Sequence, residues 1–184
     1  MKVLAGALQR DAGMVKIEGR EVHFSSPKDA KAAGIATIYQ EFMLAPDLTV
    51  TENIFIDRLN SEGKIIKWKS LNEQAGKLLA EMGFKDINPK RKVANLSVAY
   101  QQVVEICKSI SRNVKVLILD EPTAVLTVKE IEKLFALLKK LKADGVSIIY
   151  ISHRMSELDE ITDRVTVMRD GSYVSTEVIK EVTR

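Results

Sequence analysis

The 184-residue chain contains one cysteine, Cys107. A single cysteine cannot close a disulfide within the chain and cannot supply a CxxC metal site. Its neighbours in the sequence include Val103, Val104, Ile106 and Ile110, so we expect its thiol to be a buried packing group. This use of cysteine is typical of a protein from a reducing compartment.

Long hydrophobic runs are also absent. No apolar stretch approaches the roughly 18 residues that a membrane-spanning helix needs. Met1 and Lys2 are not followed by the apolar core and cleavage site of a secretory signal. The sequence therefore predicts a soluble, cytosolic chain.

Blocks of basic charge are absent as well. Lysine and arginine total 28 against 25 for aspartate and glutamate, which gives a net charge of +3. The short segment 88–92 (NPKRK) is expected to be a solvated loop, and we expect no nucleic-acid partner. At this length and with 46% hydrophobic residues, the chain is expected to form one domain.

The stretch Val114–Thr127 (VKVLILDEPTAVLT) is the most informative part of the chain. An unbroken apolar run from Val116 to Leu119 predicts a strand of a parallel sheet that is covered on both faces. The run stops at Asp120 and Glu121, and ligands of open α/β sheets bind at the carboxyl ends of strands. The carboxylates have two interpretations. They form a polar strand end that caps the next helix, or Asp120 holds Mg²⁺ on a nucleotide while Glu121 orients or deprotonates an attacking water.

Hydrophobic periodicity and turn residues divide the rest of the chain into alternating strands and helices. Three helices are expected to begin at capping boxes, which are Thr49-x-x-Glu52, Ser70-x-x-Glu73 and Thr127-x-x-Glu130. The remaining expected elements are the tail of a helix at 1–8, a hairpin of 14–18 and 21–24, a helix at 29–33, a helix at 97–110, strands at 35–39, 115–119 and 146–151, a helix at 154–162, and a hairpin of 165–168 and 173–175. This order predicts an α/β fold with a largely parallel sheet.

Four short motifs fall at expected strand ends or helix starts. Alone, each has an ordinary explanation: Gln40 as a surface residue, Ser97 as a helix N-cap and His153 as a satisfied histidine at a strand end. In the order IYQ, LSVAYQQ, VLILDEPT and YISHR, however, they resemble the Q-loop, signature, Walker B and H-loop of ATP-binding-cassette (ABC) ATPases. The resemblance covers essentially the whole chain. The stretches LAGAL, LTVTENIF and EPTAVLT are similar to the first nucleotide-binding half of the ATP-binding subunits of simple-sugar importers of the ribose, galactose and xylose type.

The resemblance implies a fold and a domain organisation. Residues 1–184 would form a single, amino-terminally truncated ABC ATP-binding domain with a P-loop NTPase-like parallel sheet flanked by helices. A helical subdomain would lie at approximately 50–112, beside a small antiparallel β portion. The strand that leads into the phosphate loop of this family would be a neighbour of strand 115–119, whose edge would otherwise be unpaired.

The resemblance also implies a role for each motif, with ATP and Mg²⁺ as the cofactors. Asp120 would support Mg²⁺, Glu121 would be the catalytic base, and His153 would contact the γ-phosphate. Gln40 would touch the metal or the water and couple the site to a membrane subunit. The signature residues would contact ATP held by the opposite subunit of a head-to-tail dimer, and they are Ser97, Val98, Ala99, Tyr100 and Gln101. A helix that begins at Ser97 offers free amide groups and a favourable dipole to an anion.

The sequence departs from the family pattern in three places. Val98, Ala99 and Tyr100 replace the glycines of the common LSGGQ signature, and Thr127 replaces the usual aspartate of the D-loop. None of the nine glycines belongs to a GxxxxGK[ST] phosphate loop. We therefore expect Met1 to lie a few residues after that loop, and we do not expect the chain alone to be an active ATPase.

The expected partners are transmembrane permease subunits, a second ATP-binding domain and, indirectly, a periplasmic or extracellular sugar-binding protein. The permease would dock on the region from Gln40 to Val50, and the protein would be peripheral on the cytoplasmic face of the cell membrane. The alternative is a non-hydrolysing interaction module derived from the same family. A chromosome-maintenance ATPase of the superfamily ranks last, because the about 55 residues between Gln40 and Leu96 contain no sustained coiled-coil heptads. The sequence does not identify the sugar.

Overall fold

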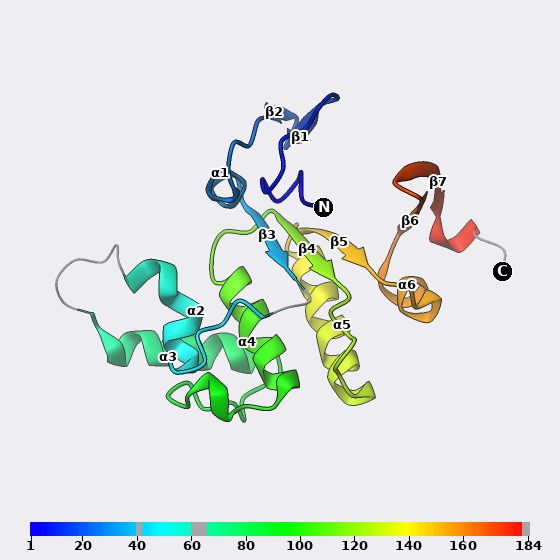
Figure 1. The fold of residues 1–184 in the computed structure, drawn as a ribbon. Coiled ribbons are helices and arrows are strands. Elements are labelled where there is room, and N and C mark those ends of the chain that lie inside the picture. The colour runs from blue at the N-terminus through cyan, green and yellow to red at the C-terminus, as the bar shows by residue number, and fades with distance from the viewer. Residues whose placement is uncertain (40–41, 60–65, 182–184) are drawn as a thin grey trace.

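The computed structural model describes residues 1–39, 42–59 and 66–181. Strands and helices alternate through most of this chain (Figure 1). The strands are β1 (Val15–Ile17), β2 (Arg20–Val22), β3 (Ile35–Ile38), β4 (Val116–Asp120), β5 (Ser147–Ile151), β6 (Arg164–Arg169) and β7 (Ser172–Val178). The helices are α1 (Pro27–Ala32), α2 (Val50–Leu59), α3 (Trp68–Glu81), α4 (Val98–Ile110), α5 (Val128–Ala143) and α6 (Met155–Ile161), with short 3₁₀ turns at Val93–Asn95 and Ile179–Glu181.

The central sheet is parallel and has the strand order β3-β4-β5. Ile38 pairs with Leu119 and Asp120 pairs with Ile151, so the carboxyl ends of the three strands meet at one edge. This confirms the α/β prediction. The expected unpaired edge of strand 115–119 is wrong, because β4 has a partner on each side and the outer strands of the described sheet are β3 and β5.

The apolar run of β4 is buried on both faces of the sheet. Leu117 and Leu119 belong to the main core, and Ile118 faces a smaller cluster with Ala30 and Ile35. All three β4 side chains are fully buried. Burial of each is worth about 1.5–3 kcal/mol, which explains why a strand without alternating polarity is stable here.

The helices begin largely where the polar signals predict. Thr49 and Glu52 exchange hydrogen bonds at the start of α2, Thr127 and Glu130 do so at α5, and the Ser97 hydroxyl caps α4. The prediction that Ser70 opens a helix is wrong, because α3 already begins at Trp68 and lacks a side-chain cap. Figure 1 shows α2 and α3 beside α4, at a distance from the β1–β2 hairpin.

The amino-terminal segment forms hydrogen-bonded turns rather than a helix. The amide of Gly6 donates to the carbonyl of Val3, and that of Ala7 donates to Lys2, which is the pattern that closes a helix. Gly6 has φ +71°, and a Cβ added there would lie 2.4 Å from the carbonyl oxygen of Ser26. The expected helix tail is therefore reduced to its final turn.

Both predicted hairpins are present. β1 pairs with β2 and β6 pairs with β7, each antiparallel. Figure 1 shows the β6–β7 hairpin standing away from the central sheet on the side of α6. In the described part of the chain, no helix is long and apolar enough to cross a membrane.

Candidate functional site

The carboxyl end of β4 places two acidic residues at the edge of the sheet. Asp120 is the last residue of the strand and is half-buried. Glu121 follows with φ +47°, a left-handed conformation that is uncommon for a residue with a side chain. Its amide still donates to the carbonyl of Ile151 at 3.0 Å, so the ladder to β5 continues through it. Such local strain is common at functional sites.

The Glu121 side chain contacts His153, which follows the end of β5. The His153 Nδ1 and Glu121 Oε1 atoms are 2.9 Å apart, and the two side chains are 73% and 35% exposed. Because an ionised carboxylate only accepts hydrogen bonds, Nδ1 must carry the proton in this contact. The other ring nitrogen, Nε2, then donates to a phosphate oxygen only when the ring is protonated. The structure thus brings together two residues that are 32 positions apart in the sequence.

A third carboxylate, Glu157 on α6, was not singled out by the sequence. It accepts hydrogen bonds from Thr123 in the loop after β4 and from three residues at the end of β5: Tyr150, Ser152 and Arg154. Burial by itself raises the pKa of Glu157, but these hydrogen bonds outweigh it and hold that pKa below its ordinary value of 4.5. Burial and the bond to Glu157 raise the pKa of the Tyr150 phenol. Only its spacing of four residues from His153 could have indicated Glu157.

The carboxylate oxygens at this edge of the sheet are ligands of the type that magnesium prefers. Magnesium is usually held by one or two carboxylates together with substrate phosphates, and Asp120 supplies one hard oxygen ligand beside Glu121. Among the residues that the structure describes, no group of three or more His, Cys, Asp or Glu side chains could hold a metal by itself. The second predicted ligand, Gln40, lies outside the described residues.

The predicted signature residues form the start of α4. The Ser97 hydroxyl accepts a hydrogen bond from the Tyr100 amide at 3.3 Å, and Val98 is 50% exposed whereas Ala99 is buried. The Tyr100 phenol donates to Asp86 and packs edge-on against Phe84. The side-chain amide of Gln101 donates from Nε2 to the carbonyl of Leu96 at 3.2 Å. The side chains of Tyr100 and Gln101 therefore bond within the domain, and the helix start presents Ser97 and Val98 outward.

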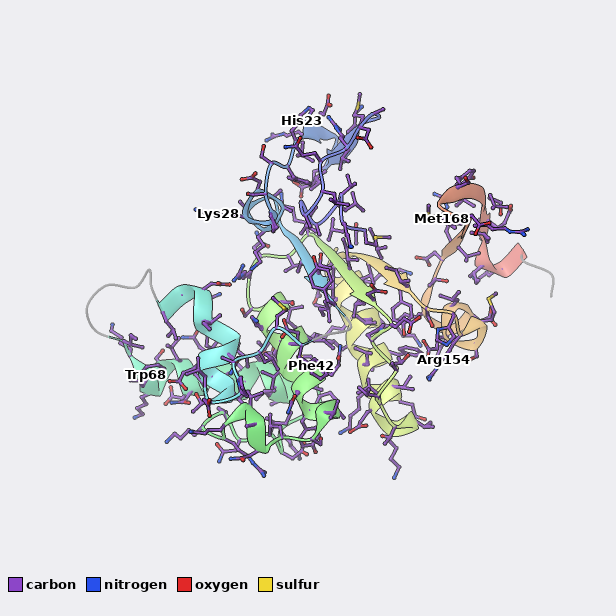
Figure 2. The ribbon with its side chains drawn as sticks, viewed as in Figure 1. His23, Lys28, Phe42, Trp68, Arg154 and Met168 are labelled. Atoms are coloured by element: carbon purple, nitrogen blue, oxygen red, sulfur yellow. The ribbon has the colours of Figure 1, made fainter. Side chains whose placement is uncertain are left out.

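Residues 42–44 of the loop after β3 carry one exposed and two half-buried apolar side chains. Met43 is 66% exposed, whereas Phe42 and Leu44 are half-buried and Leu44 packs against the main core. The Met43 carbonyl accepts a hydrogen bond from the Lys108 ammonium on α4. Figure 2 shows Phe42 among the side chains between α4 and α5.

The model of the family described as "ABC transporter" matches residues 1–124. The chain belongs to the ABC transporter family. This ABC chain is 48% identical to the ribose import ATP-binding protein RbsA of Halalkalibacterium halodurans, over 100% of this chain and 37% of that protein. It is 49% identical to RbsA 1 of Streptomyces avermitilis, over 95% of this chain and 33% of that protein. The chain therefore spans about a third of the length of the curated relatives that it matches.

Solved ABC cassettes share the fold. The ADP conformation of MJ1267, an ATP-binding cassette of an ABC transporter, is 26% identical with a TM-score of 0.80, covering 98% of this chain and 76% of that chain. A nucleotide-free ATP-binding cassette from an ABC transporter is 23% identical with a TM-score of 0.81, covering 96% of this chain and 74% of that chain. These likenesses confirm the predicted fold class of this ABC chain.

Proposed function

We propose that this chain is the hydrolytic part of an ATP-binding subunit of an ABC importer for a simple sugar, in which ATP hydrolysis drives transport. The observation that carries the proposal is the Glu121–His153 contact at the carboxyl edge of the sheet, directly beside Asp120. The names of the relatives, which are ribose import ATP-binding proteins, support a sugar and make ribose the first one to test.

Phosphoryl transfer to water needs an oriented nucleophile and compensation of charge more than it needs covalent chemistry. Glu121 would accept the proton of the attacking water, and a protonated His153 would donate from Nε2 to the γ-phosphate. Asp120 would hold Mg²⁺, and the ion would supply positive charge beside the phosphates. Gln40 would be a second residue at the metal and would couple the site to the membrane subunit. The half-burial of Glu121 supports this role, because it limits the bulk waters that compete with the attacking water for the carboxylate.

The start of α4 would contact ATP held by a second cassette in a head-to-tail dimer. Ser97 and Val98 face outward, and the first amide groups of a helix attract phosphate oxygens. The loop at Met43 would dock on the permease, so the subunit would be peripheral on the cytoplasmic face of the membrane. A sugar-binding protein outside the membrane would act only indirectly.

The decisive experiment uses the chain extended at its amino terminus by a segment that carries a GxxxxGK[ST] loop. We expect this protein to release phosphate from Mg-ATP. Glu121→Gln should lower turnover by at least about 10²-fold, as expected for the loss of a general base, and should leave ATP binding intact. Glu160→Gln on α6 is the control, because its carboxylate is exposed and bonds only to Lys139 among the described residues. Undiminished turnover in Glu121→Gln would remove Glu121 from the catalytic role.

A second candidate is a non-hydrolysing interaction module, and the lack of a GxxxxGK[ST] loop in the sequence favours it. In that case the chain as it stands would bind vesicles that contain a sugar permease, and the extended chain would bind them without hydrolysing ATP. Hydrolysis by the extended chain argues against this candidate.

A further inference from the structure

Glu157 is a buried carboxylate at the centre of a hydrogen-bond network behind the Glu121–His153 pair. Its side chain is 7% exposed. Oε1 accepts from the Thr123 hydroxyl at 2.7 Å and from Arg154 Nη1 at 3.3 Å. Oε2 accepts from the Tyr150 and Ser152 hydroxyls, each at 2.9 Å.

Three of the four donors lie on the two loops that carry the site, and the fourth, Tyr150, lies near the end of β5. Thr123 comes two residues after Glu121, and Ser152 and Arg154 stand immediately before and after His153. The Arg154 amide also donates to the Ser152 hydroxyl at 3.0 Å, which ties the two sides of His153 together. Figure 2 shows Arg154 at α6. One carboxylate therefore connects the loop after β4 with the loop after β5.

A glutamate is well suited to this position. Four donors need an acceptor with several lone pairs, and only an ionised carboxylate has two acceptor oxygens without a donor of its own. Hydrogen bonds to an ionised group are about twice as strong as bonds between neutral groups. Glutamine would replace one acceptor oxygen with an amide nitrogen, and alanine would leave all four donors without their acceptor.

We propose that Glu157 is a positioning residue that fixes the loops of Glu121 and His153 against each other and thereby holds the pair at hydrogen-bond distance. Because Glu157 belongs to α6, a shift of this helix changes both loops together. The importance of this role for hydrolysis rests on the proposed function, but the geometric statement is testable without nucleotide.

The test is the tautomer of His153, measured by long-range ¹H–¹⁵N NMR on the chain as it stands. The chain has only two histidines, His23 and His153, so their signals are separable. Under conditions where the imidazole ring carries a single proton, we expect that proton on Nδ1 of His153 in the unaltered chain. Glu157→Ala should abolish this preference, and Thr123→Val, which removes one hydroxyl from a buried site, should weaken it.

Glu160→Ala, on the same helix, is the matched control and should leave the His153 spectrum unchanged. If Glu157→Ala does not fold, Thr123→Val decides. A folded variant that keeps the Nδ1 proton as the unaltered chain does would overturn the positioning role. Absence of the Nδ1 preference in the unaltered chain would also overturn it, because there would be no pair to position. Phosphate release by the extended chain tests the proposed function separately, so the two failures are distinguishable.

Discussion

At the scale of single residues, the site uses two glutamates in opposite ways. The Glu121 side chain is partly exposed and contacts His153, whereas Glu157 is buried and accepts four hydrogen bonds. Such a difference in environment separates a group that exchanges protons from a group that must stay ionised. The first is suited to chemistry and the second to holding geometry.

Glu157 should make stability depend on pH in acid. Hydrogen bonds keep its folded-state pKa below 4.5, so the unfolded chain binds the proton first as the pH falls. The stabilisation from Glu157 is therefore fully present above about pH 4.5 and is lost as the pH falls through the folded pKa. Glu157→Gln should cost about 1–3 kcal/mol at pH 7.

Urea unfolding between pH 3 and pH 7 measures this effect. The difference in unfolding free energy between the unaltered chain and Glu157→Gln should shrink below pH 4.5. A difference that stays constant over the whole range would show that the ionised form of Glu157 contributes nothing.

At the scale of elements, the loop after β3 places neighbouring apolar side chains in two different environments. Met43 points outward, whereas Leu44 packs on the main core. Met43→Glu should therefore leave the fold and ATP hydrolysis of the extended chain intact while reducing sugar uptake with its permease. Leu44→Glu is the contrast, because it should reduce stability and all activities together. Normal uptake by Met43→Glu would exclude the loop as the docking surface.

The sequence predicts the elements well where local signals decide them. The β4 run is apolar because both its faces are buried, and the capping residues at α2, α4 and α5 act within four residues of themselves. The start of α3 is missed because Ser70 carries the expected signature, yet no capping bond forms there. The link that Glu157 makes between the two loops is missed because it depends on Thr123, which is 34 positions away and is brought near only by the folded sheet.

β5 is an outer strand of the described sheet, and the backbone along its outward edge is the next feature to test. The Ser147 amide and the Ile151 carbonyl form hydrogen bonds on the β4 side of the strand. Because the backbone groups of successive strand residues point to opposite sides, those of Ile148 and Tyr150 point away from β4. Among the described strands, none pairs with that side of β5. Open apolar edges of this kind promote association between chains.

Amide hydrogen exchange at several concentrations tests this expectation. In dilute solution, Ile148 and Tyr150 should exchange faster than Ile149, which lies between them and faces β4. Their exchange should slow as the concentration rises and larger species appear on size-exclusion chromatography. Exchange that does not depend on concentration, in a chain that stays monomeric, would contradict association through β5.

At the scale of the whole molecule, the chain has the sheet edge of the site but no phosphate-loop motif in its sequence. That loop supplies several backbone amides and a lysine to the phosphates. We expect isothermal titration calorimetry of the chain with Mg-ATP to show no binding in the micromolar range. Micromolar binding by a monomer would require a phosphate site other than the motif.

The left-handed backbone of Glu121 has a consequence for directed evolution. Asparagine and glycine adopt this conformation more readily than glutamate does, so a library of this chain selected only for heat resistance should accumulate them at position 121. The same library, built in the extended chain and selected for sugar uptake with its permease, should keep glutamate. Comparing the residues that survive the two selections distinguishes what folding requires at position 121 from what activity requires there.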